Sequence, residues 1–167
     1  MNVLVILGSK SDLSITEHGL SLLREFGLSH SLRIASAHRT PDLVHEIIRD
    51  FESQQGNVVI AVAGKAAHLP GVVASLTIRP VIGVPVAGSA TAGLDSLLSI
   101  SQMPAGIPVA CMGHGEAGFT NACLLAAAIM ASSSPSHPLN KTLNEYRKAQ
   151  SSSVRADDQA SRRDFKL

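Results

Sequence analysis

The segment 3-VLVILGSKSD-12 determines how the rest of the chain is interpreted. Its unbroken aliphatic run, Val3 to Leu7, predicts a strand that is buried on both faces. A glycine ends the run, and Ser11 and Asp12 then offer N-caps for a helix that stops at Gly27. A buried strand that leads directly into a helix is typical of α/β proteins.

Further strand-like runs, each bounded by Gly or Pro, alternate with helical patterns along the chain. We expect strands at 31–35, 58–63, 81–84 and 107–111, and helices at 40–51, 69–77, 94–101, 119–132 and 139–150. This alternation predicts an α/β fold, a three-layer α/β/α sandwich in which helices cover both faces of a parallel sheet. Ligands of such sheets bind beyond the carboxyl ends of the strands, so the following segments are expected to carry the chemistry.

Composition narrows the class of protein. The 167 residues are 45% hydrophobic and 16% charged, which argues against intrinsic disorder. We expect a single catalytic domain at 1–150 and a polar C-terminal tail at 151–167. The formal net charge is +1 and no basic stripe is present, which argues against nucleic acid and anionic membranes as partners.

Cysteine usage and short apolar runs indicate a soluble protein of the cytoplasm. Cys111 and Cys123 form no CxxC motif, which argues against a disulfide framework and a structural zinc site. No basic leader precedes the first apolar run, so no signal peptide is expected. The longest apolar run, Ala122 to Ala131, is about half the length that a membrane span needs. A helix there has no polar face, so it is either fully buried in the core or in contact with another subunit.

The segment after the first strand suits a phosphorylated sugar. Free backbone amides near Ser9 and Ser11, together with the helix dipole, attract phosphate. Asp12 suits a sugar diol one group away from that phosphate. A plain N-cap remains an equally good interpretation of these residues.

The segments after the second and third strands add acid–base chemistry. Ser36-Ala37-His38-Arg39 combines a guanidinium that can hold phosphate with an imidazole that exchanges protons near neutral pH. The third segment, 63-AGKAAHLPG-71, has small residues that admit a ligand close to the backbone, and it adds Lys65 and His68. His68 alone would more simply be a helix cap.

Other polar residues are weaker candidates. The small-residue stretch 85–93 is either a closing flap or a flexible connection. His114 lies between two glycines, which favours a turn over a catalytic pair with Glu116. No second metal-ligand residue lies beside His38 or His68, and no Gly-x-Ser-x-Gly elbow occurs. The residues therefore indicate a histidine-assisted, phosphate-holding site without a metal.

Six segments together resemble the family of 5-(carboxyamino)imidazole ribonucleotide mutases of purine biosynthesis, in its bacterial mutase branch. They are GSKSD, SAHRTPD, AAHLPG, PVIGVPV, GLDSLLS and QMPAGIPV, in the family's order and spacing. The resemblance implies a flavodoxin-like fold, a homo-octamer with sites at subunit junctions, and no metal or organic cofactor. It also implies movement of a carboxylate from the exocyclic nitrogen of a ribonucleotide to a ring carbon, and a possible hand-over of substrate from the enzyme that makes it.

The resemblance also implies residue roles. His38 would be the general acid and base, and His68 would help to enclose the carboxylate or the released carbon dioxide. The implied substrate-binding residues are Ser9, Ser11, Asp12, Ser36, Ala37, Arg39, Gly64, Lys65, His68 and Leu69. The family usually has Ala-Gly-Ala-Gly-Gly before its Ala-Ala-His-Leu-Pro, whereas this chain has Val62 and Lys65 in place of two of those glycines.

Three other functions compete with the mutase interpretation. The first is direct carboxylation of aminoimidazole ribonucleotide with carbon dioxide. The second is a flavin-binding domain of the same fold, which would be yellow when purified. The third is a nucleotide-binding scaffold without catalysis, which would leave the clustered His38 and Arg39 without a purpose.

Overall fold

The computed structural model describes residues 2–164 and divides into two compact units, of which the first runs to Ala126. The first unit contains a five-stranded parallel sheet in the order β2-β1-β3-β4-β5. The strands are β1 (Val3–Leu7), β2 (His30–Ile34), β3 (Val58–Gly64), β4 (Val81–Val86) and β5 (Ala110–Cys111). This is the flavodoxin-like order, in which the connection reverses direction beside β1, and it confirms the predicted α/β fold class.

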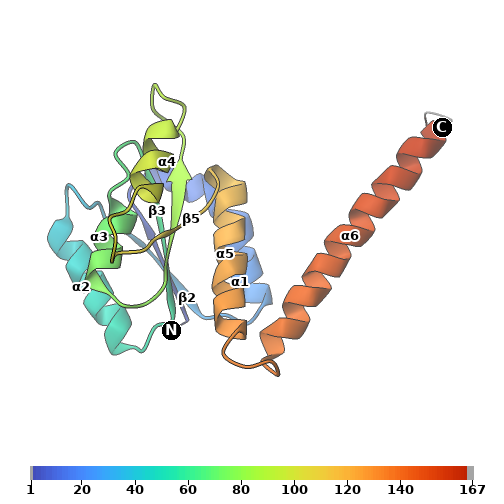
Figure 1. The fold of residues 1–167 in the computed structure, drawn as a ribbon, viewed down its shortest axis with the longest axis horizontal. Coiled ribbons are helices and arrows are strands. Elements are labelled where there is room, and N and C mark those ends of the chain that lie inside the picture. The colour runs from blue at the N-terminus through green and yellow to red at the C-terminus, as the bar shows by residue number, and fades with distance from the viewer. Residues whose placement is uncertain (1, 165–167) are drawn as a thin grey trace. The chain divides into compact units, whose positions relative to one another are not determined.

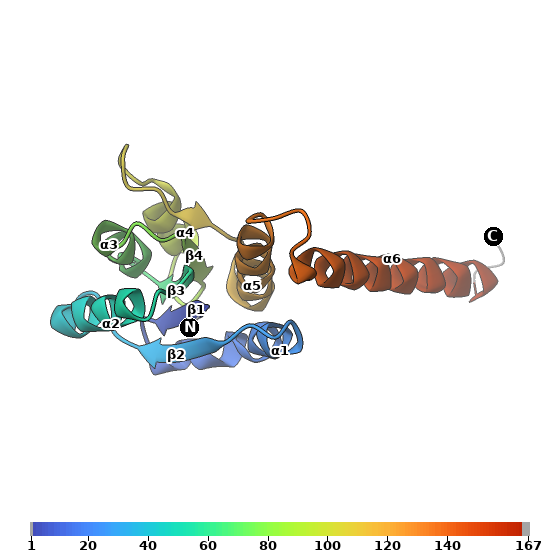
Figure 2. The same cartoon turned by 90° about the horizontal axis from the view of Figure 1, so that it is seen from below.

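Helices cover both faces of this sheet (Figures 1 and 2). The helices are η1 (Lys10–Ile15, a 3-10 helix), α1 (Glu17–Glu25), α2 (Pro41–Ser53), α3 (Leu69–Leu76), α4 (Leu94–Ser101) and α5 (Gly115–Ala131). Helices α2, α3 and α4 pack on one face, and α1 packs on the other together with the part of α5 that belongs to the first unit. The sheet therefore forms the middle layer of a three-layer sandwich.

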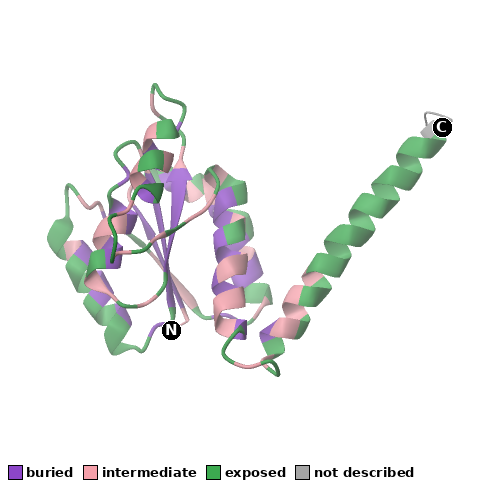
Figure 3. Cartoon of the chain, viewed as in Figure 1, coloured by how far each residue is buried: buried purple, intermediate pink, exposed green. Residues whose placement is uncertain are grey.

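Aliphatic strands explain this layering. All residues of β1 are buried, and so are those of β3 up to Ala63 (Figure 3). Alternate strand residues point to opposite faces, so both faces need apolar cover. On one face Phe51 and Ile47 of α2 pack with Leu4, Ile6 and their neighbours in a single cluster. The core positions the carboxyl ends of the strands, from which the candidate site is built.

Two predicted helices begin differently in the structure. The single helix expected up to Gly27 is a 3-10 helix followed by α1, because Ser9 caps the first turn and Thr16 separates the two segments. Helix α5 begins at Gly115, four residues before the predicted start at Phe119. Phe119 is fully buried and lies inside the helix, so its apolar side chain does not identify the first residue of the helix.

Strand β5 is shorter than the predicted strand at 107–111. Only Ala110 and Cys111 pair with β4. Pro108 has no N–H group to donate to a neighbouring strand, which explains why pairing starts after it.

The second unit begins at Ala127 and contains α6 (Pro138–Asp164). The helix was expected to end near Gln150, but it continues because neither glycine nor proline interrupts it. Ion pairs one turn apart, Lys141 with Glu145 at 3.8 Å and Arg162 with Asp158 at 3.2 Å, support it locally. The division into 1–150 and 151–167 stays a prediction, and residues 165–167 of that tail lie outside the described residues.

Neither cysteine of the described chain is in a disulfide. Burial raises the pKa of the Cys123 thiol to about 12, so this group is neutral. No helix within residues 2–164 is both long and apolar enough to cross a membrane.

Candidate active site

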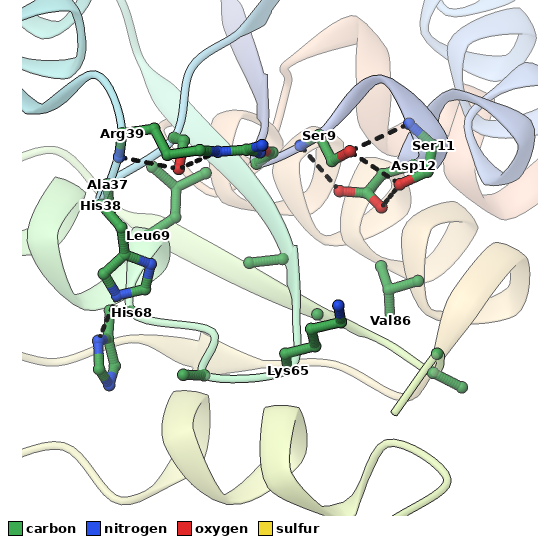
Figure 4. Close-up of a pocket in the computed structure, with 17 residues that line it drawn as sticks. Ser9, Ser11, Asp12, Ala37, His38, Arg39, Lys65, His68, Leu69 and Val86 are labelled. Carbon is green, nitrogen blue, oxygen red and sulfur yellow. Dashed lines mark hydrogen bonds between the residues drawn. The ribbon is translucent and has the colours of Figure 1, made fainter. Parts of the chain in front are cut away.

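The carboxyl ends of the first four strands surround one cavity of about 520 Å³ (Figure 4). Its walls are the segments that follow β1, β2, β3 and β4. All the predicted site residues line it, namely Ser9, Ser11, Asp12, Ser36, Ala37, His38, Arg39, Gly64, Lys65, His68 and Leu69. The sheet order explains this, because β1 lies between β2 and β3 and brings their following loops together.

The first wall is a hydrogen-bonded capping box. The Ser9 amide donates to Asp12 Oδ2 at 3.1 Å, and the Ser11 amide donates to Ser9 Oγ at 3.3 Å. The Ser11 hydroxyl lies 2.9 Å from Ser9 Oγ and 3.1 Å from Asp12 Oδ1. The N-cap is thus Ser9, two residues before Ser11 and three before Asp12, and its bonds fix the Asp12 carboxylate at the cavity wall.

Asp12 is buried, with 6% of its surface exposed. Desolvation raises the pKa of its carboxyl group, and hydrogen bonds from Ser11 and Ser9 oppose that rise. Because the folded protein holds this proton more tightly than the unfolded chain, Asp12 contributes stability at low pH that is lost as the pH rises through its folded pKa.

We therefore expect the Asp12→Asn variant to gain in unfolding free energy relative to the wild type as the pH rises from below to above that folded pKa. Urea denaturation of both proteins across the acid range measures the difference. A difference that shrinks with rising pH would mean that the carboxylate is stabilised by its surroundings.

The second wall, the segment after β2, places Arg39 beside the first wall. Nη2 of Arg39 donates to the Gly8 carbonyl oxygen at 3.4 Å, and its Nε lies 3.5 Å from Ser36 Oγ. Thr40 is the residue before α2, but its hydroxyl accepts from the Ser36 amide at 2.9 Å and does not cap the helix. The loop is therefore tied to itself, and two of the N–H groups of the guanidinium are used to orient it.

The third wall, the segment after β3, places the imidazole of His68 beside that of His38. Nε2 of His38 lies 2.8 Å from Nδ1 of His68, and the two rings meet edge to face with centroids 4.9 Å apart. His68 precedes α3 without capping it through its side chain. Because each ring nitrogen can donate or accept, the pair can exchange a proton along this bond. Both side chains are exposed in the single chain, so water is excluded only when a ligand or another chain covers them.

The fourth wall was missed as a set of binding residues. Val86, Ala87 and Gly88 line the cavity and carry no polar side chain that would mark them. The signal available was their place, because Val86 ends the fourth strand and Ala87 and Gly88 directly follow it. Gly8, Ala63 and Ala66 complete the lining for the same reason.

Hydrogen bonds hold the far end of the small-residue stretch 85–93, beyond the fourth wall. The buried Ser96 hydroxyl lies 2.9 Å from the Gly93 carbonyl oxygen and 3.1 Å from that of Val86. Nε2 of His114 lies 2.8 Å from the same Gly93 oxygen. Gly93 has φ of +91°, and a Cβ there would lie 2.7 Å from His114, so only glycine fits. The stretch is therefore a connection tied at both ends, and His114 helps to hold it.

Replacing Ser96 by alanine is expected to lower the unfolding free energy by about 1–2 kcal/mol, because the Val86 carbonyl oxygen loses the hydroxyl that donates to it and the link from Val86 to Gly93 is broken. Chemical denaturation measures the change. Ser99→Ala on the same helix is the matched control, since Ser99 donates only to the Asp95 carbonyl oxygen one turn before it. Equal effects of the two changes would contradict the anchoring role of Ser96.

Within residues 2–164 no group of three or more His, Cys, Asp or Glu side chains is placed to hold a metal ion. The cavity instead combines one carboxylate, two cations and a pair of imidazoles. These groups can bind an anionic ligand and move a proton.

The model of the family described as AIR carboxylase matches residues 2–153. The chain belongs to this family. The N5-carboxyaminoimidazole ribonucleotide mutase of Methanocaldococcus jannaschii is 48% identical over 98% of this chain and 99% of its own length. The enzyme of the same name from Pseudomonas aeruginosa is 46% identical over 90% of this chain and 91% of its own. These matches confirm the predicted resemblance.

A solved structure of similar shape is that of PurE from Treponema denticola. It superposes with a TM-score of 0.83 at 28% identity, over 94% of this chain and 96% of its own. The AIR carboxylase family thus accounts for the fold as well as for the sequence.

Proposed function

We propose that the chain converts N5-carboxyaminoimidazole ribonucleotide into 4-carboxy-5-aminoimidazole ribonucleotide, a step of purine biosynthesis. The observation that carries this proposal is the His38–His68 pair at 2.8 Å in a cavity that also holds Arg39 and Asp12. The named mutases, which align over nearly the whole chain, support the reaction. The shift of a carboxylate on a ribonucleotide needs an imidazole that transfers a proton and neighbouring groups that bind the anions.

His38 is proposed as the general acid and base. Its imidazole protonates the exocyclic nitrogen as the nitrogen–carbon bond to the carboxylate breaks and carbon dioxide forms. The ring carbon then attacks carbon dioxide, and the same imidazole removes the proton from that carbon. His68 holds the ring of His38 through the hydrogen bond and can share its proton.

The other walls are proposed to bind the ribonucleotide. Arg39 and the amides near Ser9 and Ser11 suit the phosphate, and Asp12 suits the ribose hydroxyls. Ser36 and Ala37 lie beside them, while Gly64, Lys65, His68 and Leu69 enclose the reacting end of the base. A closed site keeps carbon dioxide beside the ring, which makes its recapture an effectively intramolecular step.

An assay with two substrates tests this proposal. Wild-type protein is expected to isomerise the carbamate ribonucleotide without added bicarbonate. Turnover of aminoimidazole ribonucleotide with bicarbonate, and none of the carbamate, would support the direct carboxylase to which the family's description refers. The purified protein is expected to be colourless, and a yellow flavin spectrum would contradict the proposal.

The proposed setting is a cytoplasmic homo-octamer that uses neither metal nor organic cofactor. Exposure of His38 and His68 in the single chain supports an assembly that covers them. On α5, Leu124, Leu125 and Ile129 are only partly buried within the chain, which supports contact of this helix with another copy. Transient hand-over of substrate belongs to the same proposal. In Dictyostelium discoideum a relative that is 50% identical over 90% of this chain and 15% of its own length is named a bifunctional purine synthesis protein.

A further inference from the structure

Lys65 has a backbone conformation that is rare for a residue with a side chain. Its φ is +57°, in the left-handed region where a Cβ crowds the following carbonyl oxygen. The preceding Gly64 packs closely on β4, since a Cβ there would lie 3.1 Å from the Val86 oxygen. The turn therefore cannot relax without losing this contact, and a lysine occupies a place where glycine would be less strained.

This strained turn puts the Lys65 side chain at the cavity. Lys65 lines it, and in Figure 4 its ammonium group points into the space between the walls. Arg39 lies across that space, with its guanidinium directed toward Ser9. No ion pair of the described residues involves Lys65, since the two that occur lie within α6.

The formal charges of the cavity fit a ligand with two separate anionic groups. Lys65 and Arg39 are its cations, and Asp12 is its carboxylate. Asp12 already accepts hydrogen bonds from Ser9 and Ser11, so it is engaged by its own segment. The substrate of the proposed function has two such groups, a phosphate and a carboxylate.

We propose that Lys65 binds the migrating carboxylate, and so determines the preference of the site for carboxylated over decarboxylated ribonucleotide. The inference rests on the proposed function. Lys65 lies three residues before His68, whose ring contacts His38. Figure 4 shows its side chain turned toward Asp12 and Val86, and its flexible four-carbon stem can swing to the end of the cavity where the proton is transferred. Arg39 and the Ser9 segment at the other wall remain for the phosphate.

The charge of Lys65 acts on binding more than on the chemical step. The carboxylate is present in the substrate and in the product, and the ammonium group attracts it equally in both. Carbon dioxide, formed between them, is neutral and gains little from the cation. Binding of this kind stabilises the bound substrate and product more than the intermediate, so it lowers KM and does not raise kcat. Lys65 takes no part in the proton transfer, which is assigned to His38.

Three substitutions separate charge from strain. Lys65→Ala removes the ammonium group and keeps the strained Cβ, Lys65→Gly removes both, and Lys65→Arg keeps both. We expect KM to rise about tenfold in the alanine and glycine variants and to stay near wild type in the arginine variant. The thermal midpoint should be higher for Lys65→Gly than for Lys65→Ala, because only glycine relieves the turn.

A binding experiment identifies the anion. In the His38→Asn background, which prevents turnover, calorimetry compares 4-carboxy-5-aminoimidazole ribonucleotide with 5-aminoimidazole ribonucleotide. Adding Lys65→Ala is expected to lower the affinity for the carboxylated ribonucleotide about tenfold and to leave the affinity for the decarboxylated one unchanged. Equal loss for both would place Lys65 at the phosphate, and no loss for either would place it in solvent; both results overturn the inference. Failure of the wild-type protein to isomerise the carbamate ribonucleotide would refute the proposed function. The two-substrate assay detects that failure independently of this binding experiment.

Discussion

Replacing His38 by asparagine is expected to lower kcat/KM for the isomerisation by about 10³- to 10⁴-fold, near the upper range for a lost general acid–base group. Asparagine keeps a polar side chain of similar length but cannot exchange a proton near neutral pH. The ribonucleotide should still bind, because the Arg39 side chain and the Ser9 segment, which are proposed to hold the phosphate, are unchanged. Steady-state kinetics with the carbamate substrate and calorimetry with 4-carboxy-5-aminoimidazole ribonucleotide measure the two effects.

His45→Asn is the matched control for this change. His45 is exposed on α2, the helix that follows the loop carrying His38, and it does not line the cavity. Its variant should keep wild-type activity. A His38→Asn variant that turned over at the wild-type rate would show that another group transfers the proton.

Replacing Arg39 by methionine is expected to lower kcat/KM by about 10²- to 10³-fold, chiefly through KM, because charge-assisted hydrogen bonds to phosphate are lost. The guanidinium is oriented by the Gly8 oxygen and by Ser36, so the remaining N–H groups face a fixed position. Lysine would restore the charge without the planar fork and should recover only part of the affinity.

A ligand without phosphate tests that assignment. Wild-type protein should bind aminoimidazole ribonucleotide much more tightly than the corresponding nucleoside, and Arg39→Met should lose most of this preference. Arg49→Met on the exposed surface of α2 is the control and should keep it. If Arg39→Met discriminated between nucleotide and nucleoside as well as the wild type does, Arg39 would not be the phosphate ligand.

Much of the sheet could be predicted because its strands are chemically distinct. Val3 to Leu7 and Val58 to Ala63 are uninterrupted aliphatic runs, and both are fully buried strands. The helix expected at 40–51 is α2, and Pro41 at its start suits the first turn of a helix. The predicted site residues share the cavity because each follows a strand of one parallel sheet.

Other features depend on tertiary context that local sequence does not contain. The contact between His38 and His68 joins residues thirty positions apart and exists because only one strand, β1, lies between β2 and β3. Strand β5 is short because the unpaired segment before Ala110 includes a proline within an aliphatic run. The continuation of α6 beyond Gln150 reflects the absence of a helix stop, which three consecutive serines obscured.

The role of His114 was also hidden by local sequence. Glycines on either side suggested a turn, and the residue does precede α5. Its ring, however, contacts the Gly93 oxygen at 2.8 Å across the end of the stretch that lines the cavity. Only the fold reveals that contact, because it brings the segment before α5 to the segment before α4, so a residue interpreted as part of a turn helps to fix a cavity wall.

The central claim is that the imidazole of His38 moves one proton between the exocyclic nitrogen and the ring carbon of a bound ribonucleotide. A crystal structure of the assembled protein with 4-carboxy-5-aminoimidazole ribonucleotide tests it most directly. We expect a ring nitrogen of residue 38 about 2.6–3.2 Å from the reacting end of the base, shielded from bulk water. A side chain of residue 38 that lies far from the base, or that faces solvent in the complex, would contradict the claim.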